Sequence, residues 1–265
     1  MLSRVSTRSI LGFLLVLGVV CSAFVFGQQP AAEQGAGAQR GQGRQAAVGG
    51  GGEAARTSAA PPVFKVEWVP APGQKGQVPI VQENVADPNL ELKQYGPAAK
   101  QMLTSGTPGS DTTPFSIFSG ECAGPFAITF RQKNNYIDLT GLGKMRWMIK
   151  TSGFHVFRPV VKLADGTLLV GDHAEASVPI FVQSEFSFTG VRWIKLDPNR
   201  AVTLGTNNGP SNEIWVNNPD LSKVDEVGFA DLMPSSGHGT GGYVHLARLE
   251  VYGKAVPRAA TTSSR

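Results

Sequence analysis

Hydrophobic and polar residues alternate with a period of two along most of the chain after residue 115. The clearest example is the segment 144–150, where Met145, Trp147 and Ile149 fall on one side and Arg146, Met148 and Lys150 on the other. Successive side chains of a β-strand point to opposite sides, so this period predicts strands with one buried face. Comparable patterns predict strands at 64–68, 90–95, 125–131, 136–139, 157–163, 168–170, 181–188, 191–196, 214–216, 227–230 and 243–252.

Turn-forming residues separate these segments, and helical periodicity is almost absent. Asp165 and Gly166 lie between two predicted strands, in a position typical of a β-hairpin. Only residues 97–103, with Pro97 at the first helical position, favour one or two helical turns. Many short strands with turns between them predict an all-β fold, an antiparallel β-sandwich or jelly roll.

The first 27 residues have the layout of a secretory signal peptide. Arg4 and Arg8 precede an apolar run at 10–20, and cleavage is expected before Gln28. A retained membrane anchor is the alternative, since the run approaches the length of a membrane span. No basic stop-transfer signal follows, which favours cleavage. The sequence thus predicts an exported protein, which is either secreted or located in the periplasm or cell envelope. It would contact a membrane only if this N-terminal segment is retained.

Composition divides the remainder into four parts. Residues 28–62 are rich in Gly, Ala and Gln, with Val48 as the one aliphatic residue larger than alanine. Such a segment cannot offset an ordering entropy of about 1–2 kcal/mol per residue, so it is predicted to be a disordered linker. Residues 63–114 are predicted to be an N-terminal extension with short strands, 115–253 the β-sandwich domain and 254–265 a disordered tail.

Charge and cysteine content narrow the class of protein. The formal net charge is +4, but the excess of Lys and Arg lies before residue 63 and after residue 253. The body is slightly acidic, so nucleic acid is not an expected partner. If Cys21 leaves with the signal peptide, Cys122 has no partner for an internal disulfide. Cys122 is therefore predicted to be a small buried residue.

Sugar recognition requires an aromatic plane together with polar groups that bind hydroxyls in a fixed geometry. Arg158 and Lys162 lie on the polar side of the predicted strand 157–163. On the strand after Val191 the aliphatic residues are expected to face the core, which turns Trp193 and Lys195 outward. If both strands share a sheet, the four residues would line one ligand-binding surface. In the alternative interpretation Trp193 belongs to the core and the cations are only solvated.

Two loops carry further candidates. His238, in the glycine-rich loop SSGHGTGG, could reach a ligand from the rim of such a surface. Asp172, His173 and Glu175 lie together in GDHAE and are candidate metal ligands or an acid and base. The alternative for these three residues is an ordinary polar turn.

The order of several segments resembles the galactose-binding-like jelly-roll domains, the superfamily of many carbohydrate-binding modules and discoidin-like domains. The matching pieces lie within 121–253 and read IDLTGLGKMRWMIKTSG, VRWIKLD, DLSKVDEVGF and HLARLEVYG. This resemblance implies sugar binding on a sheet face or in the loops at one end, and a structural calcium ion. The chain departs from the pattern because it has no row of exposed Trp or Tyr residues and no matching calcium-ligand motif.

Together these features favour an exported, non-catalytic binding module for carbohydrate or another polyol, with a cell-surface glycan as partner. No G-x-S-x-G, H-E-x-x-H or phosphate loop is present. Two alternatives remain open. One is a sugar-active lyase or hydrolase in which Asp172, His173 and His238 act as acid and base; the other is a structural protein of the cell envelope.

Overall fold

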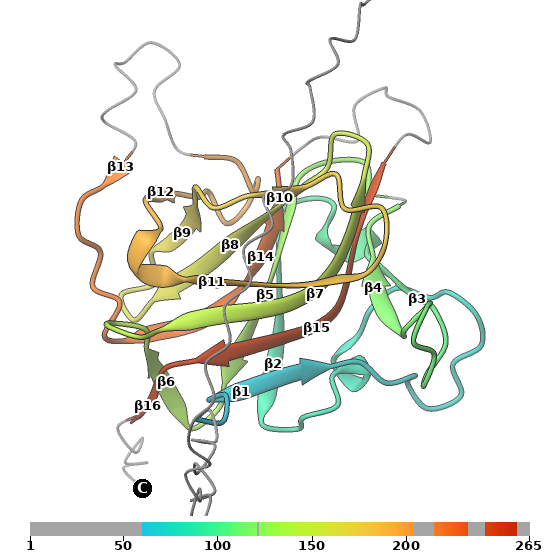
Figure 1. The fold of residues 1–265 in the computed structure, drawn as a ribbon, viewed down its shortest axis with the longest axis horizontal. Helices are drawn as coiled ribbons and strands as arrows, with labels where there is room; N and C mark the ends of the chain where they lie inside the picture. Colours follow the sequence, from blue (N-terminus) through green and yellow to red (C-terminus); the bar gives the residue numbers. More distant parts are fainter. Residues whose placement is uncertain (1–59, 121, 204–214, 233–241, 259–265) are drawn as a thin grey trace, which may run out of the picture. The chain divides into compact units, whose positions relative to one another are not determined.

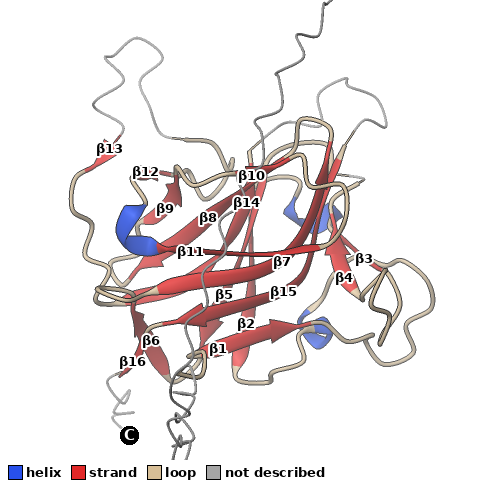
Figure 2. Cartoon of the chain, viewed as in Figure 1, coloured by secondary structure: helices blue, strands red, loops and turns tan. Residues whose placement is uncertain are grey.

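The computed structural model describes residues 60–120, 122–203, 215–232 and 242–258, all within one compact unit, Thr57–Arg265. These residues form β-strands (Figure 1), with no α-helix in the described ranges. Helical structure there is limited to short 3-10 turns (Figure 2), at η1 (Gln82–Asn84), η2 (Ala99–Gln101) and η3 (Phe188–Gly190). The described residues contain no helix with the length and apolar character of a membrane span.

The strands form two antiparallel sheets that pack face to face as a sandwich, as the periodicity predicted. The smaller sheet follows the order β11 (Val182–Ser187), β7 (Lys144–Ser152), β15 (Tyr243–Tyr252), β4 (Ser116–Phe118) and β3 (Leu103–Ser105), and β1 (Phe64–Glu67) also pairs with β15. The larger sheet follows the order β13 (Trp215–Val216), β12 (Trp193–Lys195), β9 (Leu168–Gly171), β8 (Val156–Leu163), β14 (Val224–Asp231), β5 (Phe126–Gln132) and β2 (Leu90–Tyr95), with β10 (Glu175–Ala176), β6 (Asn135–Asp138) and β16 (Lys254–Pro257) attached.

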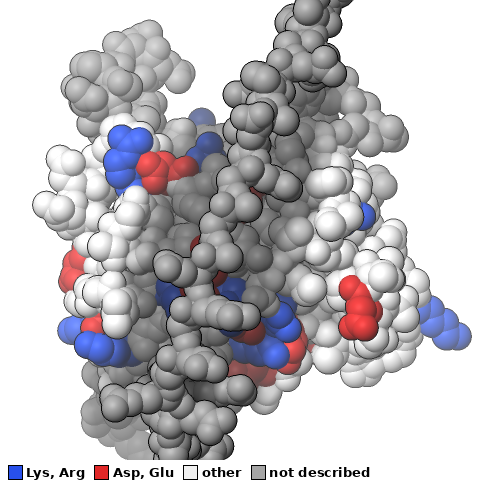
Figure 3. All heavy atoms as spheres, in the orientation of Figure 1, with Lys and Arg blue, Asp and Glu red and all other residues white. Residues whose placement is uncertain are grey.

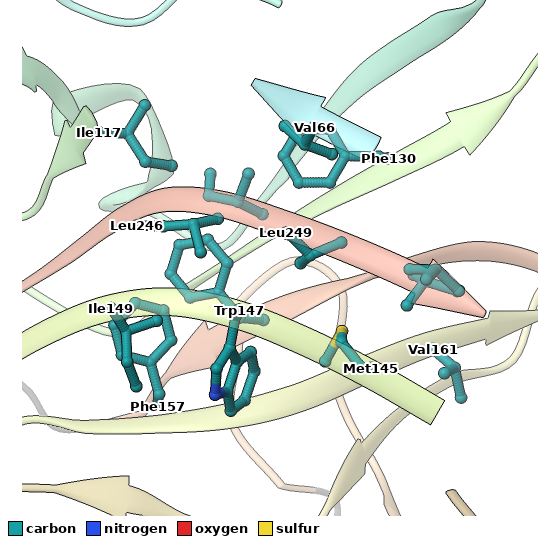
Figure 4. Packing of buried hydrophobic residues seen from close by; sticks show 14 of the residues in the cluster. Val66, Ile117, Phe130, Met145, Trp147, Ile149, Phe157, Val161, Leu246 and Leu249 are labelled. Carbon is teal, nitrogen blue, oxygen red and sulfur yellow. The ribbon is translucent and has the colours of Figure 1, made fainter. Parts of the chain in front are cut away.

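Strict alternation on β7 places its apolar side chains between the sheets. Met145, Trp147 and Ile149 are at most 1% exposed, while the residues between them are partly exposed. Figure 4 shows these side chains packed with Leu249 from the neighbouring β15 and with Phe157 from β8 of the other sheet. Removing so much apolar surface from water, at about 25 cal/mol per Å², is the main stabilisation of this sandwich. Cys122 is buried in the same core, as predicted.

The larger sheet also buries part of its outer face. A second apolar cluster lies there, formed by Ala127, Val160, Leu168, Val170, Leu196 and Ala230. The segment 197–203 lies against this region, since the Gly96 backbone N–H donates to Pro198 O at 3.2 Å. A Cβ atom at Gly96 would lie only 2.5 Å from the Cβ of the fully buried Ala201. The central strands of this sheet are therefore covered on both sides.

The structure corrects two of the predicted boundaries. Residues 63–114 are not a separate extension, because β1, β2 and β3 pair with β15, β5 and β4 inside the two sheets. The tail prediction is wrong for 254–258. Strand β16 pairs with β6, and the Arg258 guanidinium pairs with Asp225 at 2.5 Å and lies 4.0 Å from the Tyr136 ring centroid. Residues 259–265, like the predicted signal peptide and almost all of the predicted linker, lie outside the described residues.

On the outer face of the smaller sheet, cations and carboxylates alternate. Arg146 pairs with Glu185 at 2.7 Å and with Glu250 at 3.3 Å, and Lys144 pairs with Glu185 at 3.0 Å. Figure 3, which views this side, shows positive and negative side chains next to one another over β7 and β15. Such a mixed surface does not produce the single-sign field that would attract a highly charged polymer.

Candidate functional site

Arg158 and Lys162 project from β8 to the outer face of the larger sheet, as the alternation predicted. The residues between them include the core side chain Val161, which is fully buried. Lys162 Nζ donates to Tyr95 Oη at 3.0 Å and to Glu226 Oε1 at 3.1 Å. Arg158 Nη1 donates to the backbone carbonyl of Asp172 at 3.3 Å. Both cations therefore bond to groups from other segments of the larger sheet.

The carboxylate of Glu226 is the centre of a polar cluster on this face. Glu226 is 1% exposed and accepts hydrogen bonds from Tyr95 Oη, Thr129 Oγ1 and Lys162 Nζ. Burial, reinforced by the charge of Glu226, raises the pKa of Tyr95 to about 12. Burial opposes the charge of Lys162, but the bonds to Tyr95 and Glu226 raise the pKa of that amine. A buried carboxylate with all its partners present acts as a structural anchor between four strands.

Trp193 does not face outward, and the predicted aromatic and cation pair is wrong. Trp193 is 1% exposed and lies in the core, with its ring centroid 6.2 Å from that of Phe188. The intervening Ile194 packs instead against the second apolar cluster on the outer face. Lys195 is exposed, on the same side of the strand as Trp193. Strands β8 and β12 do share a sheet, but the four candidates do not line one surface.

The structure separates Asp172 from the other two residues of its predicted set. Asp172 accepts from the Arg192 backbone N–H at 2.9 Å and pairs with Arg192 Nε at 2.7 Å. Burial opposes its ionisation, but these bonds hold the pKa of Asp172 below its ordinary value. His173 turns to the other side, where it stacks on Phe186 with centroids 4.0 Å apart and contacts Glu175 Oε1 at 3.1 Å.

The contacts of Asp172, His173 and Glu175 affect two hypotheses, that these residues bind a metal and that they act as an acid and base. Glu175 also accepts a short hydrogen bond from Ser184, so its carboxylate is shared between two neighbours. In the described ranges, no group of three or more His, Cys, Asp or Glu side chains could hold a metal ion. Asp172 and His173 do not converge on one cleft, as an acid and base would have to. His238 lies outside the described residues.

A polar and aromatic cleft lies at the β12–β13 edge of the larger sheet. It has a volume of about 390 Å³ and is lined by Phe188, Thr189, Val191, Arg192, Trp193, Trp215, Val216, Asn217, Asn218, Pro219 and Leu221. We call it the Arg192–Trp215 cleft. The Arg192 guanidinium carbon lies 4.3 Å from the centroid of the partly exposed Trp215 ring. An aromatic ring, two side-chain amides, a hydroxyl and a guanidinium therefore meet in one concavity.

Local structure explains how these groups are positioned. Trp215 lies opposite Ile194 and Val216 opposite Trp193, so pairing of β13 with β12 fixes which face each ring takes. Beyond β13 the chain turns at Asn218, which has the left-handed φ of 48° that asparagine tolerates better than most residues. The ion pair with Asp172 holds Arg192 at the rim. Asp172 thus positions the cation without lining the cleft.

Sequence analysis missed Trp215 and the two asparagines after it. The segment WVNNPD places an aromatic residue, two amides and a proline in succession, which is a signal for a polar turn next to a strand. The pattern does not show that Arg192, more than twenty residues earlier, contacts Trp215. That proximity arises because β12 pairs with both β9 and β13.

A second cleft, of about 350 Å³, is bordered by Leu142, Lys144 and Tyr252. Lys144 Nζ lies 4.8 Å from the centroid of the Tyr252 ring. Its lining contains no side-chain amide and is largely apolar. The Arg192–Trp215 cleft therefore offers the better set of groups for a polar ligand.

Comparisons with known proteins find similarity in structure only. No family model and no curated protein matches the chain. The structure is similar to the family 11 carbohydrate-binding module from Clostridium thermocellum solved with a β-1,3-1,4-mixed-linked tetrasaccharide, at 15% identity and a TM-score of 0.38, over 69% of this chain and 98% of that one. It is also similar to an exo-β-agarase, at 11% identity and a TM-score of 0.35, over 69% of this chain and 25% of that one.

Proposed function

We propose that this chain is an exported, non-catalytic module that binds carbohydrate or a similar polyol in the Arg192–Trp215 cleft. The carrying observation is the convergence of an indole, two amides and a guanidinium in a concavity of about 390 Å³. A sugar ring presents C–H groups that suit an aromatic surface, and hydroxyls that suit amide and guanidinium donors. A cleft of this size lies within the range of small-molecule sites in proteins, about 300–1,000 Å³.

Each described group has a defined role in this proposal. Trp215, with the aliphatic wall around Leu221, provides apolar contact for the ring face. Asn217 and Asn218 each offer an amide donor and acceptor, which can bind vicinal hydroxyls. Arg192 offers charged donors that are already oriented by Asp172. Because Asp172 fixes the cation before the ligand arrives, less conformational entropy is lost on binding.

Titration calorimetry of Trp215→Ala against glycans tests the proposal. Mixed-linked β-1,3-1,4-glucan, whose tetrasaccharide the family 11 module holds, is a suitable first probe. Removing the indole should weaken binding about tenfold or more, since a lost aromatic contact of about 1.5 kcal/mol corresponds to that factor. Tyr252→Ala is the matched control, because it removes the aromatic ring of the second cleft.

Two results would count against the proposal. If the folded protein bound no member of a broad glycan panel, the carbohydrate function would be wrong. If Tyr252→Ala abolished binding while Trp215→Ala left it intact, the function would stand but the cleft would be misassigned.

A further inference from the structure

Only part of the hydrogen-bonding capacity of the Arg192 guanidinium is taken up by described residues. Its Nε pairs with Asp172 Oδ2 at 2.7 Å and its plane lies over Trp215, yet its two terminal nitrogens have no hydrogen-bond partner among the described residues. The side chain is 71% exposed, at the mouth of the cleft. Terminal guanidinium nitrogens form the fork that binds a carboxylate or a sulfate through two parallel hydrogen bonds.

No other arginine described below combines these three features. Arg146 directs its terminal nitrogens to Glu185 and Glu250, and Arg258 directs one to Asp225. Arg200 resembles Arg192 in its 2.7 Å Nε pair with Asp197, but within the described ranges no aromatic ring lies beneath it, and it lines neither of the clefts described above. Arg192 therefore combines an ion pair that orients it, an aromatic support and unused donors that face a concavity.

The local charge also favours an anion. Arg192 is the only charged residue that lines the described part of the cleft. The adjacent carboxylate of Asp220 is turned away, bonded to the Ser222 backbone N–H at 3.0 Å and hydroxyl at 2.6 Å. Behind Arg192, the single carboxylate of Asp172 is flanked by two cations, because Arg158 donates to the Asp172 carbonyl. A ligand carboxylate would meet a net positive charge with no acidic residue in the wall.

We infer that the Arg192–Trp215 cleft recognises an anionic glycan, one whose sugar rings carry a carboxylate or a sulfate. This inference rests on the proposed carbohydrate function and specifies its ligand class. The anionic group would occupy the terminal nitrogens of Arg192, while the ring contacts Trp215 and its hydroxyls reach Asn217 and Asn218. Both anionic groups match the fork of a guanidinium, so the experiment separates them.

Calorimetry with three oligosaccharides tests the inference: an oligogalacturonate, a sulfated galactan oligosaccharide and a neutral mixed-linked glucan. We expect at least one anionic ligand to bind about tenfold more tightly than the neutral one, with an affinity that falls as NaCl rises from 20 to 500 mM. Arg192→Gln should remove that advantage, so that the anionic ligand loses more affinity than the neutral one. Arg200→Gln, with the same change of charge at a similar ion pair, is the control and should bind like the wild type.

The outcomes separate the two levels of the proposal. Preference for only the carboxylate or only the sulfate supports the inference and identifies the group. Equal binding of neutral and anionic ligands, unchanged in Arg192→Gln, overturns anion recognition and leaves carbohydrate binding intact. An equal loss in Arg192→Gln and Arg200→Gln shows general charge attraction and also overturns it. Binding of none of the ligands, nor of any broader panel, refutes the carbohydrate function itself. Thermal unfolding of each variant confirms that it is folded.

Discussion

Trp193 and Trp215 lie on neighbouring strands and have opposite environments. Trp193 is 1% exposed and borders the Arg192–Trp215 cleft only from the core, whereas Trp215 is partly exposed in that cleft beneath Arg192. Residue type does not distinguish them, since both follow polar or aliphatic residues in short strands. The difference comes from register: β12 and β13 pair so that each indole lies opposite an aliphatic residue, and only one of them faces the partner sheet.

The cluster around Glu226 shows the same dependence on neighbours and allows a test at the scale of one residue. Lys162→Met leaves a carboxylate that is 1% exposed without its cation. We expect the free energy of unfolding to fall by about 2 kcal/mol, the cost of an incompletely satisfied buried charged group. Lys195→Met, at an exposed position, should change it by less than about 0.5 kcal/mol. Urea denaturation of both variants measures the difference, and equal effects would show that the cluster adds no stability.

His245 provides a prediction about pH. Its Nδ1 lies 3.1 Å from Ser116 Oγ and its ring stacks on Phe118. Burial, with a smaller contribution from the charge of Lys150, lowers the pKa of His245 to about 4. The unfolded chain, with a histidine pKa of about 6.5, binds a proton that the folded chain does not accept between these values. The stability is therefore full above pH 6.5 and decreases as the pH falls towards 4.

The expected loss over this window is at most about 3 kcal/mol, because each pKa unit corresponds to about 1.4 kcal/mol. The His245→Gln variant should lose this part of the pH dependence, and comparison with it cancels the contribution of other titrating groups. Urea denaturation series at pH 7, 6, 5 and 4.5 measure the slope for both proteins. Identical slopes would show that His245 does not titrate with a lowered pKa.

At the scale of elements, the position of a strand in its sheet determines which of its sides are buried. On β7 the period of two predicted the buried and exposed sides correctly, because one side lies in the main core. On β8 it placed Arg158 and Lys162 opposite the core side, but Val160 between them is buried in the second apolar cluster. On β14 nearly every residue is buried, since the strand lies between β5 and β8 in a sheet that is covered on both faces. The sequence of such a strand is apolar on both sides, so alternation of polar and apolar residues does not show which side faces the core.

Strand β16 is predicted to contribute to the stability of the fold. Its residues are mostly exposed, yet it pairs with β6 along four residues and is followed by Arg258, which bonds to Asp225. Truncation after Gly253 should lower the free energy of unfolding by about 2 kcal/mol or more, since several hydrogen bonds of about 1 kcal/mol each are lost. Truncation after Arg258 keeps every one of these contacts and is the control. Thermal or urea unfolding compares the two, and equal stability would show that β16 contributes nothing.

The whole molecule joins these elements through contacts between residues far apart in the sequence. Strand β1 pairs with β15, and β16 with β6, so both ends of the described chain are built into the sheets. The candidate site likewise depends on distant segments, since Asp172 follows β9, Arg192 precedes β12 and Trp215 begins β13. A cleft assembled in this way changes whenever the register of one strand changes.

The amino-acid sequence alone determined that the protein is an all-β sandwich and that Arg158 and Lys162 leave β8 on one side, because a period of two orders side chains within a strand. It could not determine whether Trp193 on β12 faces the core or the outside. Both faces of the larger sheet are covered there, so apolar residues occur on both sides of the strand. It also could not place Arg192 beside Trp215 or pair β16 with β6. Those contacts join residues whose proximity depends on strand order and register, which only the tertiary structure decides.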